Sequence, residues 1–135
     1  MRGFEKKLKG LSLRDECFIL SVILICIRNY LLNDKKGKVQ YFNDNSFIFI
    51  YLDKVKYFEI IDGVICKTSE FNIEDFIYII CDKSRAIIDR ISEELGYLTE
   101  IDDTEGTADA IRIDMYKSIL EHNLNKLEME YKKEW

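Results

Sequence analysis

The feature that most constrains this chain is an apolar run, CFILSVILICIRNYLL, which extends from Cys17 to Leu32. Between Glu16 and Arg28 the run holds 11 residues without a charge. As a helix, these residues would be roughly 17 Å long, whereas the hydrocarbon core of a bilayer is about 30 Å thick. The run is therefore too short to span a membrane, and we expect it in the core of a folded domain.

The length of this run favours a helix over a strand. Its Ile and Val content suits a buried strand, but 16 residues are long for a strand and ordinary for a helix. Ser12 followed by Asp15 three positions later is close to a capping box, and Gly37 suits the end of the segment. We predict a helix over 13–33 that is apolar nearly all round and central to the core.

The next segment, 38–68, has the pattern of short strands joined by turns. KVQYF is followed by the turn residues NDN and then by SFIFIYLD, and KVKYFEII is followed by Asp62-Gly63 and VICKT. An Asp-Gly pair between apolar runs is a strong hairpin signal, because a type I′ turn needs positive φ at both central residues. Asp53-Lys54 is either a turn without glycine or a bend in one long strand. We predict an antiparallel meander of three or four strands.

Two further helices are predicted after the strands. The first ends at Gly96, residues 97–106 form an acidic loop, and the last helix starts near Thr107. The apolar face of the first comprises Ile73, Phe76, Ile77, Ile80, Ser84, Ile87, Ile88, Ile91 and Leu95. That of the second comprises Ile113, Tyr116, Leu120, Leu124, Leu127 and Tyr131, widened by Ile111, Met115 and Ile119.

The predicted fold is a single α+β domain over 1–135. Its order is α-β-β-β-β-α-α, with one N-terminal and two C-terminal helices. The chain of 135 residues is 47% hydrophobic and contains no proline, which favours one folded domain of long elements. The simplest packing puts the helices on one face of the antiparallel sheet.

The net charge of −5 is unevenly distributed along the chain. Segment 89–114 carries nine acids against Arg90 and Arg112, a net −7 in 26 residues. The acids that we expect to form a partner-binding patch are Glu93, Glu94, Glu100, Asp102, Asp103, Glu105 and Asp109. A nucleic-acid binder would carry a basic stripe, and the sequence pI near 5.0 argues against such a partner. The residues around the apolar run do not match a signal peptide, so we expect a cytoplasmic protein without a membrane partner.

No trusted metal, cofactor or catalytic motif is visible. Each of the four cysteines lies within an apolar pattern, none in a C-x-x-C pair, so we expect core thiols rather than ligands or disulfides. In IDDTEGTAD, aligning Gly106 with the invariant glycine of a calcium loop puts Ile101 and Arg112 where carboxylates belong. His122, the only histidine, lacks a linear motif that would supply a nucleophile. We predict a protein without cofactor, metal or enzymatic activity.

Aromatic residues are concentrated in the predicted strands. They could form a stacking platform for single-stranded nucleic acid, but without a basic surround a half-buried sheet is the better interpretation. SFIFIYLD is apolar on both faces, so the second face needs a cover: a helix, a second subunit or a partner. A homodimer is one way to supply it.

These features indicate a non-catalytic protein-binding module. The leading hypothesis is a cytosolic immunity-type inhibitor whose acidic patch, within residues 93–109, neutralises a basic toxin domain such as a nuclease. The alternative is a small acidic chaperone or adaptor that binds through an apolar sheet face. An enzyme of unrecognised type is a third hypothesis, which no sequence motif supports.

Overall fold

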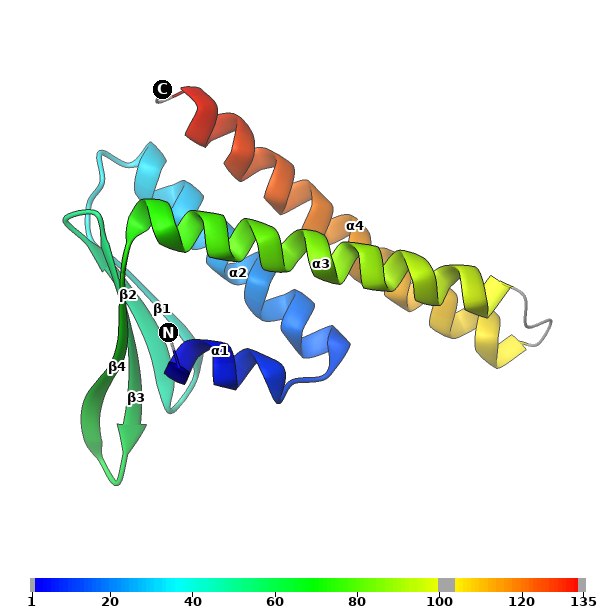
Figure 1. Cartoon of the computed structure of the whole chain (residues 1–135), viewed down its shortest axis with the longest axis horizontal. Helices are drawn as coiled ribbons and strands as arrows, with labels where there is room; N and C mark the ends of the chain where they lie inside the picture. The colour runs from blue at the N-terminus through cyan, green and yellow to red at the C-terminus, as the bar shows by residue number, and fades with distance from the viewer. Residues whose placement is uncertain (1, 100–103, 134–135) are drawn as a thin grey trace.

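The computed structural model describes residues 2–99 and 104–133 of the chain (Figure 1). The elements are α1 Arg2–Lys9, α2 Leu13–Leu32, β1 Lys38–Asn43, β2 Ser46–Tyr51, β3 Lys54–Ile61, β4 Val64–Asn72, α3 Ile73–Thr99 and α4 Thr104–Lys133. The strands form one antiparallel sheet in the order β1-β2-β3-β4. The predicted α+β class, with a four-stranded meander between N-terminal and C-terminal helices, is confirmed.

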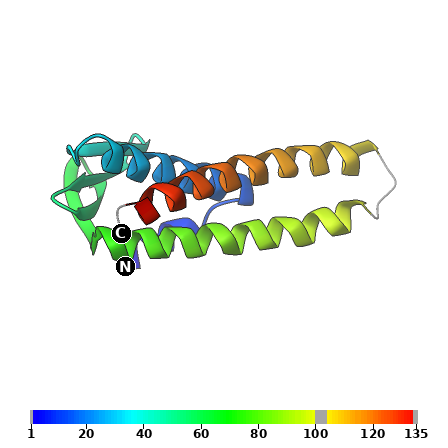
Figure 2. The ribbon, with the colours of Figure 1, turned by 90° about the horizontal axis from the view of Figure 1, so that it is seen from above.

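The helices extend to one side of the sheet, as both views of the ribbon show (Figures 1 and 2). α3 and α4 form a long antiparallel hairpin, and α2 packs along α4 and more briefly against α3 and β1. The C-terminal end of α3 and the N-terminal end of α4 therefore lie at the end of the molecule opposite the sheet.

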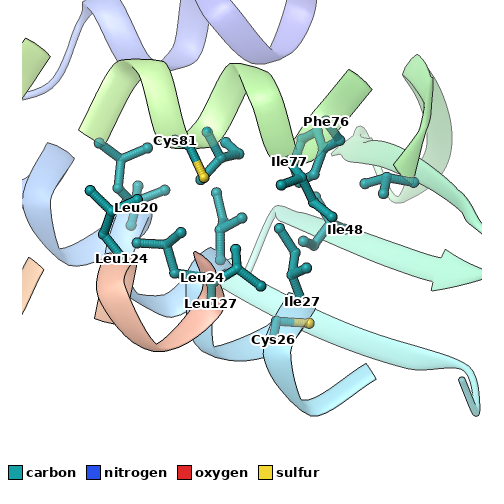
Figure 3. Close-up of a cluster of buried hydrophobic side chains, with 14 of the residues drawn as sticks. Leu20, Leu24, Cys26, Ile27, Ile48, Phe76, Ile77, Cys81, Leu124 and Leu127 are labelled. Carbon is teal, nitrogen blue, oxygen red and sulfur yellow. The ribbon is translucent and has the colours of Figure 1, made fainter. Parts of the chain in front are cut away.

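The helix α2 has the start and the burial that its sequence predicts. The Ser12 side chain accepts a hydrogen bond from the backbone N–H of Asp15 at 3.2 Å, as expected of an N-cap. Leu20, Leu24 and Ile27 lie in the core between the sheet, α3 and α4 (Figure 3). Neither α2 nor any other helix in the described ranges combines the length and apolar character that a membrane crossing needs.

Two hairpin turns set the register of the sheet. Asp62 and Gly63 have φ values of 51° and 77°, which is the positive-φ pair predicted for this turn. Leu52 and Asp53 also have positive φ, 51° and 58°, so the chain turns there without glycine. The open question at Asp53-Lys54 is resolved as a two-residue turn that lies one residue earlier.

The ends of the two C-terminal helices differ from the prediction. α3 continues through Gly96 to Thr99, and α4 already begins at Thr104, so the predicted helix end and the long acidic loop were wrong. One glycine costs a helix only about 1 kcal/mol, which packing between two long helices can outweigh. The connection shortens to residues 100–103, which lie outside the described part of the chain.

The prediction also included three exposed side chains in the buried face of α4. Ile111, Met115 and Ile119 are 58%, 57% and 52% exposed, whereas Leu120 and Leu127 on the predicted stripe are fully buried. α4 contacts α2 and α3 along that one stripe. The three residues lie about 100–180° around the helix from Leu120, at 100° per residue, and therefore face away from the core.

The short helix α1 was not predicted. It contributes Phe4 and Leu8, an i, i+4 pair that is 0% and 1% exposed in the main core. The Phe4 ring packs edge-on against Tyr57, with ring centroids 5.5 Å apart. One i, i+4 pair in a helix of eight residues is too short a pattern for recognition by periodicity.

A tyrosine and an aspartate link three separate parts of the fold. The buried Tyr30 hydroxyl on α2 donates to Asp53 Oδ1 at 2.7 Å and accepts from the Asp53 backbone N–H at 2.9 Å. The Asp53 carbonyl accepts from the N–H of Ile73, at the start of α3, at 2.9 Å. Lys35 lies 3.6 Å from the Asp53 carboxylate. The turn between β2 and β3 is thus attached to the end of α2 and to the start of α3.

We expect Tyr30→Phe to lower the free energy of unfolding by about 1–2 kcal/mol. The substitution removes a donor to a carboxylate and an acceptor for a backbone N–H at once, with little change in packing. Urea denaturation measures the loss. Tyr78→Phe is the matched control, because Tyr78 is 63% exposed on α3. A loss of the same size in the control would contradict the assigned role of Tyr30.

Candidate functional site

Four of the seven acids of the predicted patch belong to the C-terminal part of α3 and the N-terminal part of α4, which lie far from the sheet (Figure 1). Glu93 and Glu94 are exposed on the last third of α3. Glu105 and Asp109 belong to the first two turns of α4. The other three acids, Glu100, Asp102 and Asp103, lie outside the described residues.

Glu94 also borders a hollow between the three long helices. The hollow has a volume of about 270 Å³, and Arg14, Cys17 and Tyr116 are among its lining residues. Arg14 lies over the Tyr116 ring, with its guanidinium carbon 5.9 Å from the centroid. The positive charge of Arg14 therefore lies at the same hollow as Glu94. Glu93 and Glu94 are the predicted site residues whose surroundings the structure describes.

A second candidate surface is the side of the sheet that faces away from the helices. Alternation along the strands puts Ile48, Ile50 and Tyr57 in the core and leaves their neighbours on the opposite face. The residues of this surface, which we name the outer sheet face, are Val39, Tyr41, Phe47, Phe49, Tyr51 and Phe58. No described helix lies over this face (Figure 1).

The rings on the outer sheet face pack against one another across the strands. Phe47 and Phe58 are stacked with centroids 5.0 Å apart and planes at 17°, and Tyr41 lies 4.9 Å from Phe47 on the other side. This spacing is close to the distance between neighbouring strands, so the rings stand up from the sheet side by side. Phe47 is only 9% exposed between its neighbours, whereas Tyr41 is 56% exposed. Both faces of the Phe47 ring are therefore covered by neighbouring rings.

Lysines border the outer sheet face on the β3–β4 side. Lys56 and Lys67 lie 3.8 Å and 3.7 Å from the carboxylate of Glu70, in a small exposed ion-pair network. Lys54 donates a hydrogen bond to the side chain of Asn72 on the adjacent strand. The face therefore combines an apolar aromatic centre with a polar rim, as protein-binding surfaces do.

One lysine–serine pair has the residue types of a catalytic dyad. Lys7 Nζ donates to Ser46 Oγ and lies 6.0 Å from the centroid of the Tyr57 ring. Burial lowers the pKa of Lys7, and the nearby Glu59 opposes that shift. Ser46 is only 1% exposed, so a substrate carbonyl does not reach its hydroxyl in this conformation. The pair attaches α1 to the sheet.

The cysteines and the histidine do not form a site in the described part of the chain. Cys17, Cys26 and Cys81 are buried, and burial raises the pKa of each thiol to about 11. Cys66 is half-buried on β4, and His122 is exposed on α4. Within residues 2–99 and 104–133, no three His, Cys, Asp or Glu side chains are close enough to hold a metal ion.

Comparison with known proteins finds no relative. No family model, no curated protein and no solved structure matches this chain. The functional argument therefore rests on the surfaces themselves.

The sequence indicated the outer sheet face but not its geometry. The apolar residues on both faces of SFIFIYLD predicted a surface in need of a cover, whereas the standing row of rings depends on cross-strand register. The exposed residues of α4 were missed, because a 3.6-residue period fits two neighbouring stripes of one helix equally well. Only the position of α2 decides which stripe is covered.

We expect the protein to lose stability between pH 9 and pH 11. Unfolded thiols ionise near pH 9.0, whereas Cys17, Cys26 and Cys81 ionise near 11 in the fold. In this window the unfolded chain holds fewer protons, so stability falls as pH rises. Tyr57, whose pKa burial raises to about 12, acts in the same direction, and Lys7 opposes it. Urea midpoints across this range, in reducing buffer, measure the slope.

The contribution of the thiols can be isolated. Cys81→Ala should have a shallower decline than the unsubstituted chain, because one raised thiol pKa is removed. Alkylation by iodoacetamide provides the second readout: Cys66 should react first, and the three buried thiols only after unfolding. A midpoint that stays constant from pH 9 to pH 11 would contradict the assignment.

Proposed function

We propose that this chain is a non-catalytic protein-binding domain that holds its partner on the outer sheet face. The observation that carries the proposal is an aromatic surface that no described helix covers. Val39, Tyr41 and Tyr51 are 51%, 56% and 50% exposed there, next to the half-buried rings of Phe49 and Phe58. Contiguous aromatic and aliphatic surface of this kind characterises binding sites rather than ordinary solvent-facing sheet.

The arrangement of the rings favours a protein over a nucleic acid as the partner. Bases bind by stacking on free ring faces. Here the faces of Phe47 and Phe58 are turned toward each other, and Tyr41 covers the other side of Phe47. The packed rings and the side chain of Val39 suit aliphatic and aromatic groups of a protein partner. This supports an adaptor or chaperone role.

An immunity-type inhibitor is the second candidate function. It is favoured by the acids on the end of α3 that lies far from the sheet, where a basic toxin domain could approach without touching the sheet. Glu93 and Glu94 are the exposed acids available for that contact. Charge attraction of this kind speeds association and weakens with salt.

Affinity purification at two salt concentrations separates the two functions. A partner held on the outer sheet face should remain bound at high salt, and Tyr41→Ala should weaken it about tenfold or more. Tyr78→Ala on α3 is the matched control and should leave affinity unchanged. A partner that is lost at high salt, and also lost on Glu93→Lys/Glu94→Lys substitution, would establish the acidic inhibitor instead. A partner insensitive to Tyr41→Ala would overturn the first proposal.

Leu52 gives an independent test at the edge of this face. It is 74% exposed and has φ of 51°, a conformation that costs a leucine about 1 kcal/mol or more. We expect Leu52→Asn to stabilise the fold by about 0.5–1 kcal/mol in urea denaturation, since Asn tolerates positive φ. If Leu52 is retained for contact, the same variant binds the partner more weakly. Reduced stability of Leu52→Asn would contradict the strain argument.

A further inference from the structure

Another apolar surface runs along α2 and α4 and is separate from the outer sheet face. We name it the α2–α4 face; its members are Phe18, Val22, Ile25, Ile111, Met115 and Ile119. Five of them are between 44% and 64% exposed, and Val22 is partly exposed. Within each helix they follow one another at spacings of three or four, so each set forms a continuous stripe.

The two stripes meet at a hollow of about 400 Å³. Phe18 and Ile119 line it from the two helices, and the other lining residues are Arg14, Asp15, Cys17, Ser21 and Tyr116. Phe18, the most exposed residue of the face at 64%, therefore stands beside a mainly apolar depression with two charged residues at its edge. A projecting side chain next to a hole is the arrangement that interlocks helices across an interface.

The size of the α2–α4 face suits a second copy of the chain. Six large side chains that are about half exposed present roughly 500 Å² of apolar surface. A homodimer interface is about 65% apolar, so this corresponds to roughly 800 Å² per subunit, the area of a standard stable interface. A short peptide would leave much of the face uncovered.

Two exposed residues of opposite charge, Asp15 and Lys126, lie at the two ends of the face, and Arg14 lies beside Asp15. Asp15 is exposed one turn before Phe18, and Lys126 is exposed on α4 two turns after Ile119. α2 and α4 run in the same direction, since Arg14 contacts Tyr116 and Ser21 shares the hollow with Ile119. A two-fold axis across the middle of the face would place Asp15 of each copy near Lys126 of the other.

We propose that the chain forms a two-fold symmetric homodimer through the α2–α4 face, with Phe18 of each copy in the hollow of the other. The outer sheet face stays open in this dimer, so two partners can bind at once. The inference goes beyond the proposed function and uses none of its residues. Failure of one therefore leaves the other intact.

Sedimentation velocity on the full chain tests the dimer directly. From about 1 to 200 µM, the mass should rise from the 16.0 kDa of one chain toward twice that value. Phe18→Glu and Ile119→Glu should each raise the dissociation constant about 30-fold or more, because a charge then enters the apolar centre. Tyr78→Glu, on the exposed side of α3, should leave it unchanged. A chain that stays at 16.0 kDa up to about 200 µM overturns the proposal.

A charge swap provides a second test that does not disturb the core, because both residues are exposed. Asp15→Lys or Lys126→Asp alone should weaken the dimer several-fold through like-charge contacts. The double variant Asp15→Lys/Lys126→Asp should restore it, and the two single variants mixed together should form a heterodimer in preference to either homodimer. A double variant as weak as the singles overturns the two-fold arrangement. Circular dichroism confirms that each variant is folded.

Discussion

The contact between Tyr30 and Asp53 determines how the sheet is attached to the helices. One hydroxyl both donates to a carboxylate and accepts from a backbone N–H, so the turn between β2 and β3 has a fixed position on the end of α2. The same turn holds the first N–H of α3 through the Asp53 carbonyl. Because the central strands and α3 both depart from this point, the direction of the whole helical layer relative to the sheet depends on one turn without glycine.

Local patterns in the sequence were sufficient for most of the elements. The Ser12 cap, the Asp62-Gly63 turn and the period of α3 are signals carried by neighbouring residues, and each predicted element is present. The predicted helix end at Gly96 was wrong, because a helix continues through a glycine when packing against other helices stabilises the longer helix. The turn at Leu52 had no recognisable signal, since its conformation is imposed by strand pairing on both sides rather than by the residue itself.

The candidate surfaces were predictable to different extents. The sequence of β2 is apolar at nearly every position, which already indicated that a second face of the sheet is apolar and would be covered by another element or a partner. The α2–α4 face could not be predicted from the sequence, because Ile119 and Leu120 are both apolar. Only the three-dimensional position of α2 decides which of the two is covered. Of the seven acids expected to bind a partner, the structure describes the surroundings of only Glu93 and Glu94, so the acidic patch stays a prediction.

The core position of α2 also has a consequence during synthesis. Leu20 and Leu24 lie in the same buried cluster as Leu124 and Leu127, which follow about a hundred residues later in the chain. At translation rates of roughly 5–20 residues per second, these leucines leave the ribosome roughly 5–20 s before the helix that covers them. Throughout that interval the most apolar segment of the chain lacks the cover that α4 provides, while the strands and α3 emerge one after another. Part of the apolar surface of α2 therefore stays open to aggregation until the last helix emerges.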